Sequence, residues 1–312
     1  MTNLLKRLSL LFAFAIVACQ PNAPKGDSNE EETIGNHIVV TTSLLRDMVE
    51  NLLPKGEYKI ESLMGSGVDP HIYKPTRKDV QRLREADVVI FNGLHLEGRM
   101  GEIKEQLAKK QRVLTASDAF NKERFINNSE FEDGQDPHFW FDLPMWIDAG
   151  AHISHELKEL YPHHSDDIAN NFEQWATAIK YLYREVFEIL SVVPENKRII
   201  ITSHDALSYF AREFSFEVNS LQGSSTSAEF GVKDVKDMVD FIISNEIPAI
   251  FPENITSDQA LEAIVKGCEK RGYELKIAEE LYSDALGEAG TDAATFEGMV
   301  RANAVTIAEA LK

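Results

Sequence analysis

The tripeptide Asp-Pro-His occurs twice in the sequence, ending at His71 and at His138. Each copy follows a glycine-containing loop, and its proline restrains the backbone just before the histidine. Each imidazole is therefore presented from a stiff loop. The neighbouring carboxylates, Asp69 and Asp136, are candidates for orienting a histidine ring that binds a metal ion. Chance recurrence of one tripeptide is the alternative at this point.

A third histidine, His204, stands in Thr-Ser-His-Asp directly after the apolar run 198–202. Ligands in open α/β sheets bind beyond the carboxyl ends of strands, which is where this pattern places His204. In the alternative interpretation, Ser203 or Asp205 caps the following helix and His204 has no role of its own.

Asp284 lies in Leu-Tyr-Ser-Asp-Ala-Leu-Gly, after the last predicted strand. Taken alone, it fits an ordinary surface carboxylate. Taken with the three histidines, it completes a set of three imidazoles and one carboxylate, which suits a divalent transition metal. Four protein ligands fill a tetrahedral shell, an arrangement that favours metal capture over catalysis. The nitrogen-rich set favours Zn²⁺ over Mn²⁺.

Short β-rich runs alternate with amphipathic stretches, and this alternation predicts an α/β fold with mainly parallel sheets. Strands are expected at 37–42, 58–63, 87–91, 113–114, 198–202, 249–251 and 274–277. Helices are expected at 44–53, 78–85, 206–214, 232–245, 259–271 and 295–311.

Residues 163–193 differ from the rest, because this stretch contains no glycine or proline and its apolar residues recur at helical spacing. We expect one long helix there, joining two similar α/β lobes at 37–162 and 194–312. The four metal-binding candidates, two from each lobe, would close the cleft between the lobes.

The first 19 residues are typical of an export signal, with two basic residues followed by a short apolar run. The run ends in Ile-Val-Ala-Cys, which resembles a bacterial lipobox and predicts lipid on Cys19. A plain signal peptide with an incidental cysteine is the alternative. Residues 20–36 are rich in Pro, Asn, Gly, Ser and Glu and predict a flexible tether. We therefore expect an extracytoplasmic lipoprotein that is anchored to a membrane, either periplasmic or at the cell surface, with Cys268 as a lone thiol.

The formal net charge of the 312-residue chain is -19, which argues against a nucleic-acid partner. The sequence lacks the Gly-x-Ser-x-Gly and His-Glu-x-x-His patterns of common hydrolases. Glu229 and Glu253 are conceivable general bases, but nothing in the sequence connects them to the histidines. We expect a binding protein and no enzyme.

Several segments together resemble the cluster A-I zinc and manganese receptors of bacterial ABC transporters, and most of all the treponemal zinc/manganese receptors. The matching segments are 67–73, 91–97, 136–142, 202–206, 222–226, 249–251 and 281–287.

The resemblance implies two lobes bridged by a long helix, with His71, His138, His204 and Asp284 as metal ligands. It implies an ABC permease and its ATPase as partners, and we expect a monomer. Carboxylates near the ligands that are candidates for supporting them are Asp69, Asp136, Asp142 and Asp205.

Two departures leave the metal open between Zn²⁺ and Mn²⁺. The stretch 121–135 lacks the histidines of the zinc-specialised branch, and the manganese branch has Glu where this chain has His204. The alternatives to a transport receptor are an adhesin with a structural metal and, less favoured, a metallohydrolase.

Overall fold

The computed structural model describes residues 34–128, 134–227 and 230–312. The expected signal peptide, Cys19 and nearly all of the predicted tether lie outside these residues. Within them, no helix combines the length and the apolar character that a membrane-spanning segment needs.

A four-stranded parallel sheet organises the N-terminal half, which we define as the described residues before helix α5. Its order is β2-β1-β3-β4, and its strands are β1 (His37–Val40), β2 (Lys59–Ser62), β3 (Val88–Phe91) and β4 (Arg112–Thr115). All four residues of β3 are buried, as expected of a central parallel strand with both faces covered.

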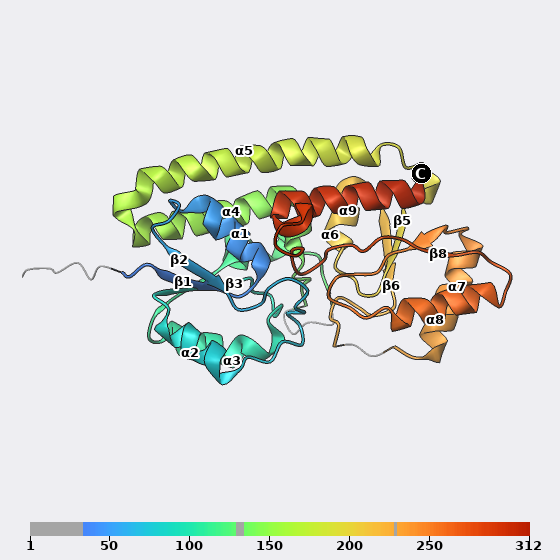
Figure 1. The fold of residues 1–312 in the computed structure, drawn as a ribbon, viewed down its shortest axis with the longest axis horizontal. Coiled ribbons are helices and arrows are strands. Elements are labelled where there is room, and N and C mark those ends of the chain that lie inside the picture. The colour runs from blue at the N-terminus through green and yellow to red at the C-terminus, as the bar shows by residue number, and fades with distance from the viewer. Residues whose placement is uncertain (1–33, 129–133, 228–229) are drawn as a thin grey trace, which may run out of the picture. The chain divides into compact units, whose positions relative to one another are not determined.

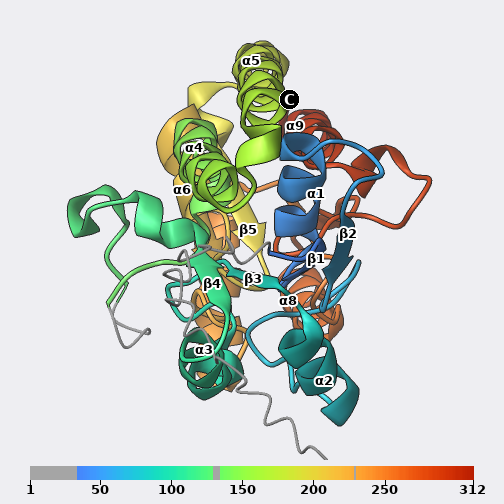
Figure 2. The same cartoon turned by 90° about the vertical axis from the view of Figure 1, so that its left-hand side faces the viewer.

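Alternate residues of this sheet pack into two different cores. Ile38, Val40 and Ile90 face the helices α1 (Ser43–Leu52) and α4 (Leu143–Leu160). Val39 and Val89 face the opposite side, where α2 (Arg77–Glu85) and α3 (Gly101–Ala108) pack. Figure 2 shows the two helix pairs on opposite sides of the sheet.

The C-terminal half, defined as the residues after α5, has shorter strands. β5 (Ile199–Thr202) pairs in parallel with β6 (Glu217–Ser220), and β7 (Ala249–Ile250) pairs in parallel with β8 (Lys276–Ile277). The backbone N–H of Phe251 donates to the carbonyl of Ile201, which links the two pairs. The helices of this half are α6 (Ser208–Phe214), α7 (Val232–Ser244), α8 (Gln259–Glu269) and α9 (Phe296–Leu311). The prediction of an α/β fold with parallel sheets is therefore confirmed.

The long helix expected at 163–193 is present as α5 (Ser165–Leu190), preceded by a 3-10 turn at Pro162–His164. Its 26 residues correspond to roughly 39 Å. α5 contacts α1, α4 and α9, so it is packed against both halves of the chain, as Figure 1 shows.

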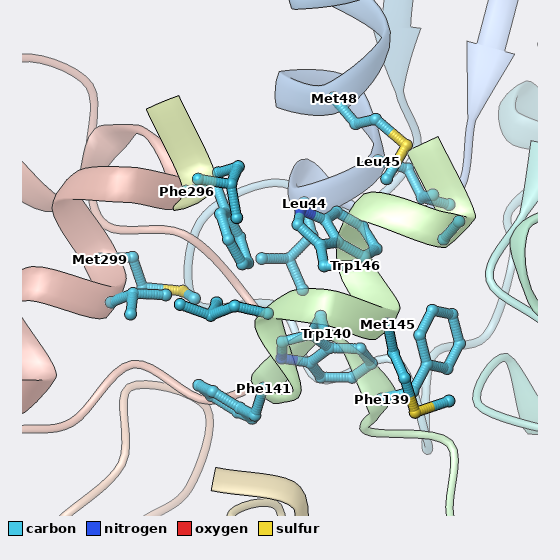
Figure 3. Close-up of a cluster of buried hydrophobic side chains, with 14 of the residues drawn as sticks. Leu44, Leu45, Met48, Phe139, Trp140, Phe141, Met145, Trp146, Phe296 and Met299 are labelled. Carbon is cyan, nitrogen blue, oxygen red and sulfur yellow. The ribbon is translucent and has the colours of Figure 1, made fainter. Parts of the chain in front are cut away.

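The two halves share one hydrophobic core. Figure 3 shows the aromatic residues that precede and begin α4 packed against α1 and α9. The indole of Trp146 stacks on the ring of Phe296, with centroids 5.2 Å apart and planes 30° apart. Because this core is continuous, packing does not mark where one lobe ends, and the lobe boundaries at 162 and 194 stay a prediction.

Candidate metal centre

Four buried side chains meet at one point: His71, His138, His204 and Asp284, each offering a ligand atom within 4.8 Å of the others. The Nε2 atoms of His71 and His138 are 3.2 Å apart. Asp284 Oδ2 lies 3.1 Å from His71 Nε2 and 3.5 Å from His204 Nε2, and Oδ1 lies 3.5 Å from His138 Nε2. The structure thus brings together all four residues that the sequence suggested.

Each of the four follows or borders a different segment of the fold. His71 lies in the loop between β2 and α2, and His138 directly precedes a 3-10 turn at Phe139–Phe141. His204 comes directly after β5, beyond its carboxyl end, and Asp284 lies in the segment between β8 and α9. The site therefore depends on the packing of the two halves against each other, which α5 and the shared core maintain.

Two of the predicted supporting carboxylates contact the site in different ways. Asp136 Oδ1 lies 2.7 Å from Nδ1 of His138 and also accepts the backbone N–H of His138, so it fixes the orientation of this imidazole. Asp69 Oδ1 accepts the backbone N–H of His71 at 2.9 Å, so it fixes the loop and not the ring.

The other two candidate carboxylates, Asp142 and Asp205, contact residues at the starts of helices. Asp142 caps α4 by accepting the backbone N–H of Met145, and it pairs with Arg212. Asp205 accepts the hydroxyl of Ser208. These contacts among the described residues join neither carboxylate to a ring nitrogen of the three histidines, and their supporting role stays a prediction.

The sequence suggested Glu253 only as a conceivable general base and did not predict its place beside His204, where it is fully buried. Its Oε1 lies 2.8 Å from Nδ1 of His204, and its Oε2 accepts the backbone N–H of His204. The sequence shows Glu253 only as a carboxylate just past an apolar strand, the same position that drew attention to His204. Glu229, the other glutamate considered, lies outside the described residues.

Burial and charge shift the pKa values of the site in opposing directions. Burial alone would lower the pKa of His138, but the carboxylates of Asp284 and Asp136 outweigh it and raise this pKa to about 9. The pKa of His204 is likewise raised against the effect of burial, by Glu253 and Asp284. Burial dominates at His71 and lowers its pKa.

Asp284 shows the complementary shift. Burial alone would raise the pKa of this carboxyl, but the neighbouring His138 and His204 lower it well below its usual range. Asp284 is therefore ionised at neutral pH, and protons on the imidazoles and a metal cation compete for the same negative charge.

Three buried polar atoms at this point make no hydrogen bond of good geometry among the described residues: both carboxylate oxygens of Asp284 and Nε2 of His204. Burying such atoms unsatisfied is costly, so they fit a site that is completed by a cation. The donor set of three imidazole nitrogens and a carboxylate matches the common chemistry of a divalent transition-metal site.

The remaining described histidines lie elsewhere. His37 begins β1 and contacts Glu61, and His152 and His155 lie on α4. His163 and His164 lie in the 3-10 turn before α5, where His164 contacts the hydroxyl of Tyr58. His95 has a positive φ of 59° and is not part of the four-residue group.

Comparison with known proteins decides the family. The family model described as the zinc-uptake complex component A, periplasmic (ZnuA), matches residues 38–310. The chain belongs to this family. The resemblance found in the sequence is thus confirmed, and the chain is a metal-binding substrate receptor of an ABC importer and not an enzyme.

Individual relatives agree with the family in sequence and in fold. The manganese-binding lipoprotein MntA of Bacillus subtilis is 37% identical over 305 residues, covering 97% of this chain and 98% of its own. The zinc-binding protein TroA of Treponema pallidum is 35% identical over 285 residues, covering 91% and 92%. The solved structure of periplasmic TroA covers 88% of this chain and 99% of its own, with a TM-score of 0.85 and 34% identity.

Proposed function

We propose that this ZnuA-family chain captures one divalent transition-metal ion directly with His71, His138, His204 and Asp284. The observation that carries this proposal is the convergence of the four buried side chains on one point. The Nδ1 atoms of His138 and His204, which face away from this point, contact the carboxylates of Asp136 and Glu253. All four positions are filled by protein, so none is left for a catalytic water.

We propose Zn²⁺ as the preferred cargo. Bonds of 2.0–2.1 Å in a tetrahedral zinc site place neighbouring donor atoms roughly 3.3 Å apart. With Oδ2 of Asp284 as the carboxylate donor, its distances to Nε2 of His71 and Nε2 of His204 are 3.1 Å and 3.5 Å. The Nε2 atoms of His71 and His138 are 3.2 Å apart, so these three separations lie close to this value. The nitrogen-rich set also favours Zn²⁺.

Mn²⁺ is the second candidate, and one specific observation favours it. Oδ1 of Asp284 faces His138 while Oδ2 faces His71 and His204, so both oxygens could bind one ion and raise the coordination number. Mn²⁺ prefers more oxygen ligands than Zn²⁺. The similarity to MntA, named as manganese-binding, supports the same alternative.

The cellular setting is also a proposal. We infer that the mature chain begins at lipidated Cys19 and that residues 20–36 tether a monomeric receptor outside the cytoplasm. The loaded receptor would deliver its ion to a membrane permease driven by a cytosolic ATPase. The lipoprotein names of relatives such as MntA support the lipid anchor.

The decisive experiment is metal analysis of protein purified without a histidine tag, followed by competition between Zn²⁺ and Mn²⁺. We expect one metal ion per chain and retention of Zn²⁺ against equimolar Mn²⁺. Preferential retention of Mn²⁺ would overturn the choice of zinc, and absence of stoichiometric binding would overturn the capture function itself. As a control, exchange of the surface residue Glu262 for Gln should leave binding unchanged.

A further inference from the structure

One carboxylate, that of Asp69, joins the two halves of the chain beside the metal centre. Its Oδ1 accepts the backbone N–H of His71 at 2.9 Å, and its Oδ2 accepts the hydroxyl of Thr226 at 2.6 Å. The two partners of Asp69 belong to different halves, and Thr226 is 157 residues away in sequence. Neither bond involves a metal ligand atom.

The turn that carries Thr226 is also hydrogen-bonded to the segment of His204. The side-chain amide of Gln222 donates to the carbonyl of Thr226 at 3.1 Å, and the backbone N–H of Gln222 donates to the carbonyl of Ser203 at 3.0 Å. A continuous series of hydrogen bonds thus connects the loop of His71 to the backbone beside His204.

The segments of His138 and Asp284 are joined by a hydrogen bond inside the shared core. The indole N–H of Trp140, two residues after His138, donates to the carbonyl of Ser283, which directly precedes Asp284. Trp140 is fully buried in the shared core. The His138 and Asp284 segments therefore stay together as long as the protein is folded.

The loop of His71 is more exposed. Gly65 and Gly67 are exposed, and the side chain of Ile72, next to His71, is 49% exposed. Gly67 has a φ of +64° and lies close to the C-terminal half. A Cβ atom added to this glycine would meet the carbonyl oxygen of Asn254 at 3.4 Å. This loop rests on the C-terminal half without being built into its core. His71 is buried, but at 6% exposure it is the least buried of the four candidates, whose other members are at most 1% exposed.

We propose that Thr226 is a positioning residue that slows metal release, by holding Asp69 and with it the loop of His71 against the C-terminal half. The inference rests on the proposed function, since it takes His71 to be a ligand. Release would require the loop to move outward, and this movement must break the bond from Thr226 to a charged acceptor, which is stronger than a bond between neutral groups.

The test compares Thr226→Val, which keeps the shape and removes the hydroxyl, with Thr226→Ser, which keeps the hydroxyl. Release of bound Zn²⁺ into excess chelator is followed by stopped-flow absorbance. We expect release about ten-fold faster for Thr226→Val, the effect of losing about 1.4 kcal/mol, and a nearly unchanged rate for Thr226→Ser. Ser225→Ala is the matched control, because the Ser225 hydroxyl contacts Ser227 in the same turn.

A second comparison tests whether Thr226 acts through Asp69. In an Asp69→Ala background, Thr226→Val should cause no further acceleration, because its partner is already absent. An equal acceleration in both backgrounds would contradict the inference, and so would a Thr226→Ser variant as fast as Thr226→Val.

The outcome is separable from that of the proposed function. Stoichiometric binding by the unsubstituted protein, with an unchanged release rate in Thr226→Val, would overturn the role of Thr226 and leave metal capture intact. The unfolding temperature of the metal-free Thr226→Val variant should equal that of Ser225→Ala. A drop in this temperature alone, without faster release, would reduce Thr226 to a structural role.

Discussion

Nδ1 of His204 lies 2.8 Å from Oε1 of Glu253, with both side chains fully buried. A carboxylate in this position orients the imidazole and makes its other nitrogen a stronger metal donor. We therefore predict that Glu253→Gln weakens metal binding by about 10- to 100-fold. Competition with a chromophoric chelator measures the change. An affinity equal to that of the exposed control Glu262→Gln would show that Glu253 does not support His204.

Metal removal should lower the stability of the folded chain. A ligand that binds only the folded state, at a thousand times its Kd, stabilises that state by about 4 kcal/mol. For a chain of this size we expect the unfolding temperature to rise by roughly 10 °C when metal is added to chelator-treated protein. Calorimetry measures the shift. Asp284→Ala should abolish the shift, and a full shift in this variant would remove Asp284 from the ligand set.

Metal affinity should fall as the pH is lowered. The pKa of His138 is raised to about 9, and that of His204 is also raised, so both rings carry protons in the metal-free protein near neutrality. Binding must displace these protons, and log K should therefore drop by up to about two units for each pH unit below 8. Titrations at pH 8, 7, 6 and 5.5 test this. A flat profile down to pH 5.5 would contradict ligation by histidine.

Asp142 should matter for stability and not for metal binding. Because it caps α4 through the N–H of Met145, Asp142→Ala should lower the free energy of unfolding by about 1 kcal/mol. Asp142→Asn, which can still cap the helix, should cost less. Both variants should bind metal within two-fold of the unsubstituted protein. Denaturant unfolding and chelator competition measure the two effects, and a large loss of affinity in either would restore the supporting role considered from the sequence.

Much of the fold was predictable because its elements carry local signals. The strand around Val88–Phe91 is a continuous apolar run, and α5 shows helical spacing without glycine or proline. The sequence did not predict β6, whose residues Glu217–Ser220 are polar or partly exposed, or where α4 begins. Such elements are stabilised by neighbours that are distant in sequence, so local patterns reveal them poorly.

The residues of the site also divide into those with a local sequence signal and those without one. His71 and His138 could be found from a repeated tripeptide, and His204 from its place after a strand. Glu253 could not, because its function depends on β7 lying beside β5, which brings two chain segments about 50 residues apart into contact. Conversely, Asp142 resembles a supporting carboxylate in sequence, yet its side chain points to a helix terminus and to Arg212.

The contact between Trp140 and His138 has a practical consequence. The indole packs edge-on against the imidazole with centroids 5.2 Å apart, while its N–H is bonded to the carbonyl beside Asp284. The emission of a tryptophan depends on the charge next to its ring. Trp140 therefore gives the protein an intrinsic fluorescent reporter, placed where the exchange of protons for a metal ion could be followed without any added label.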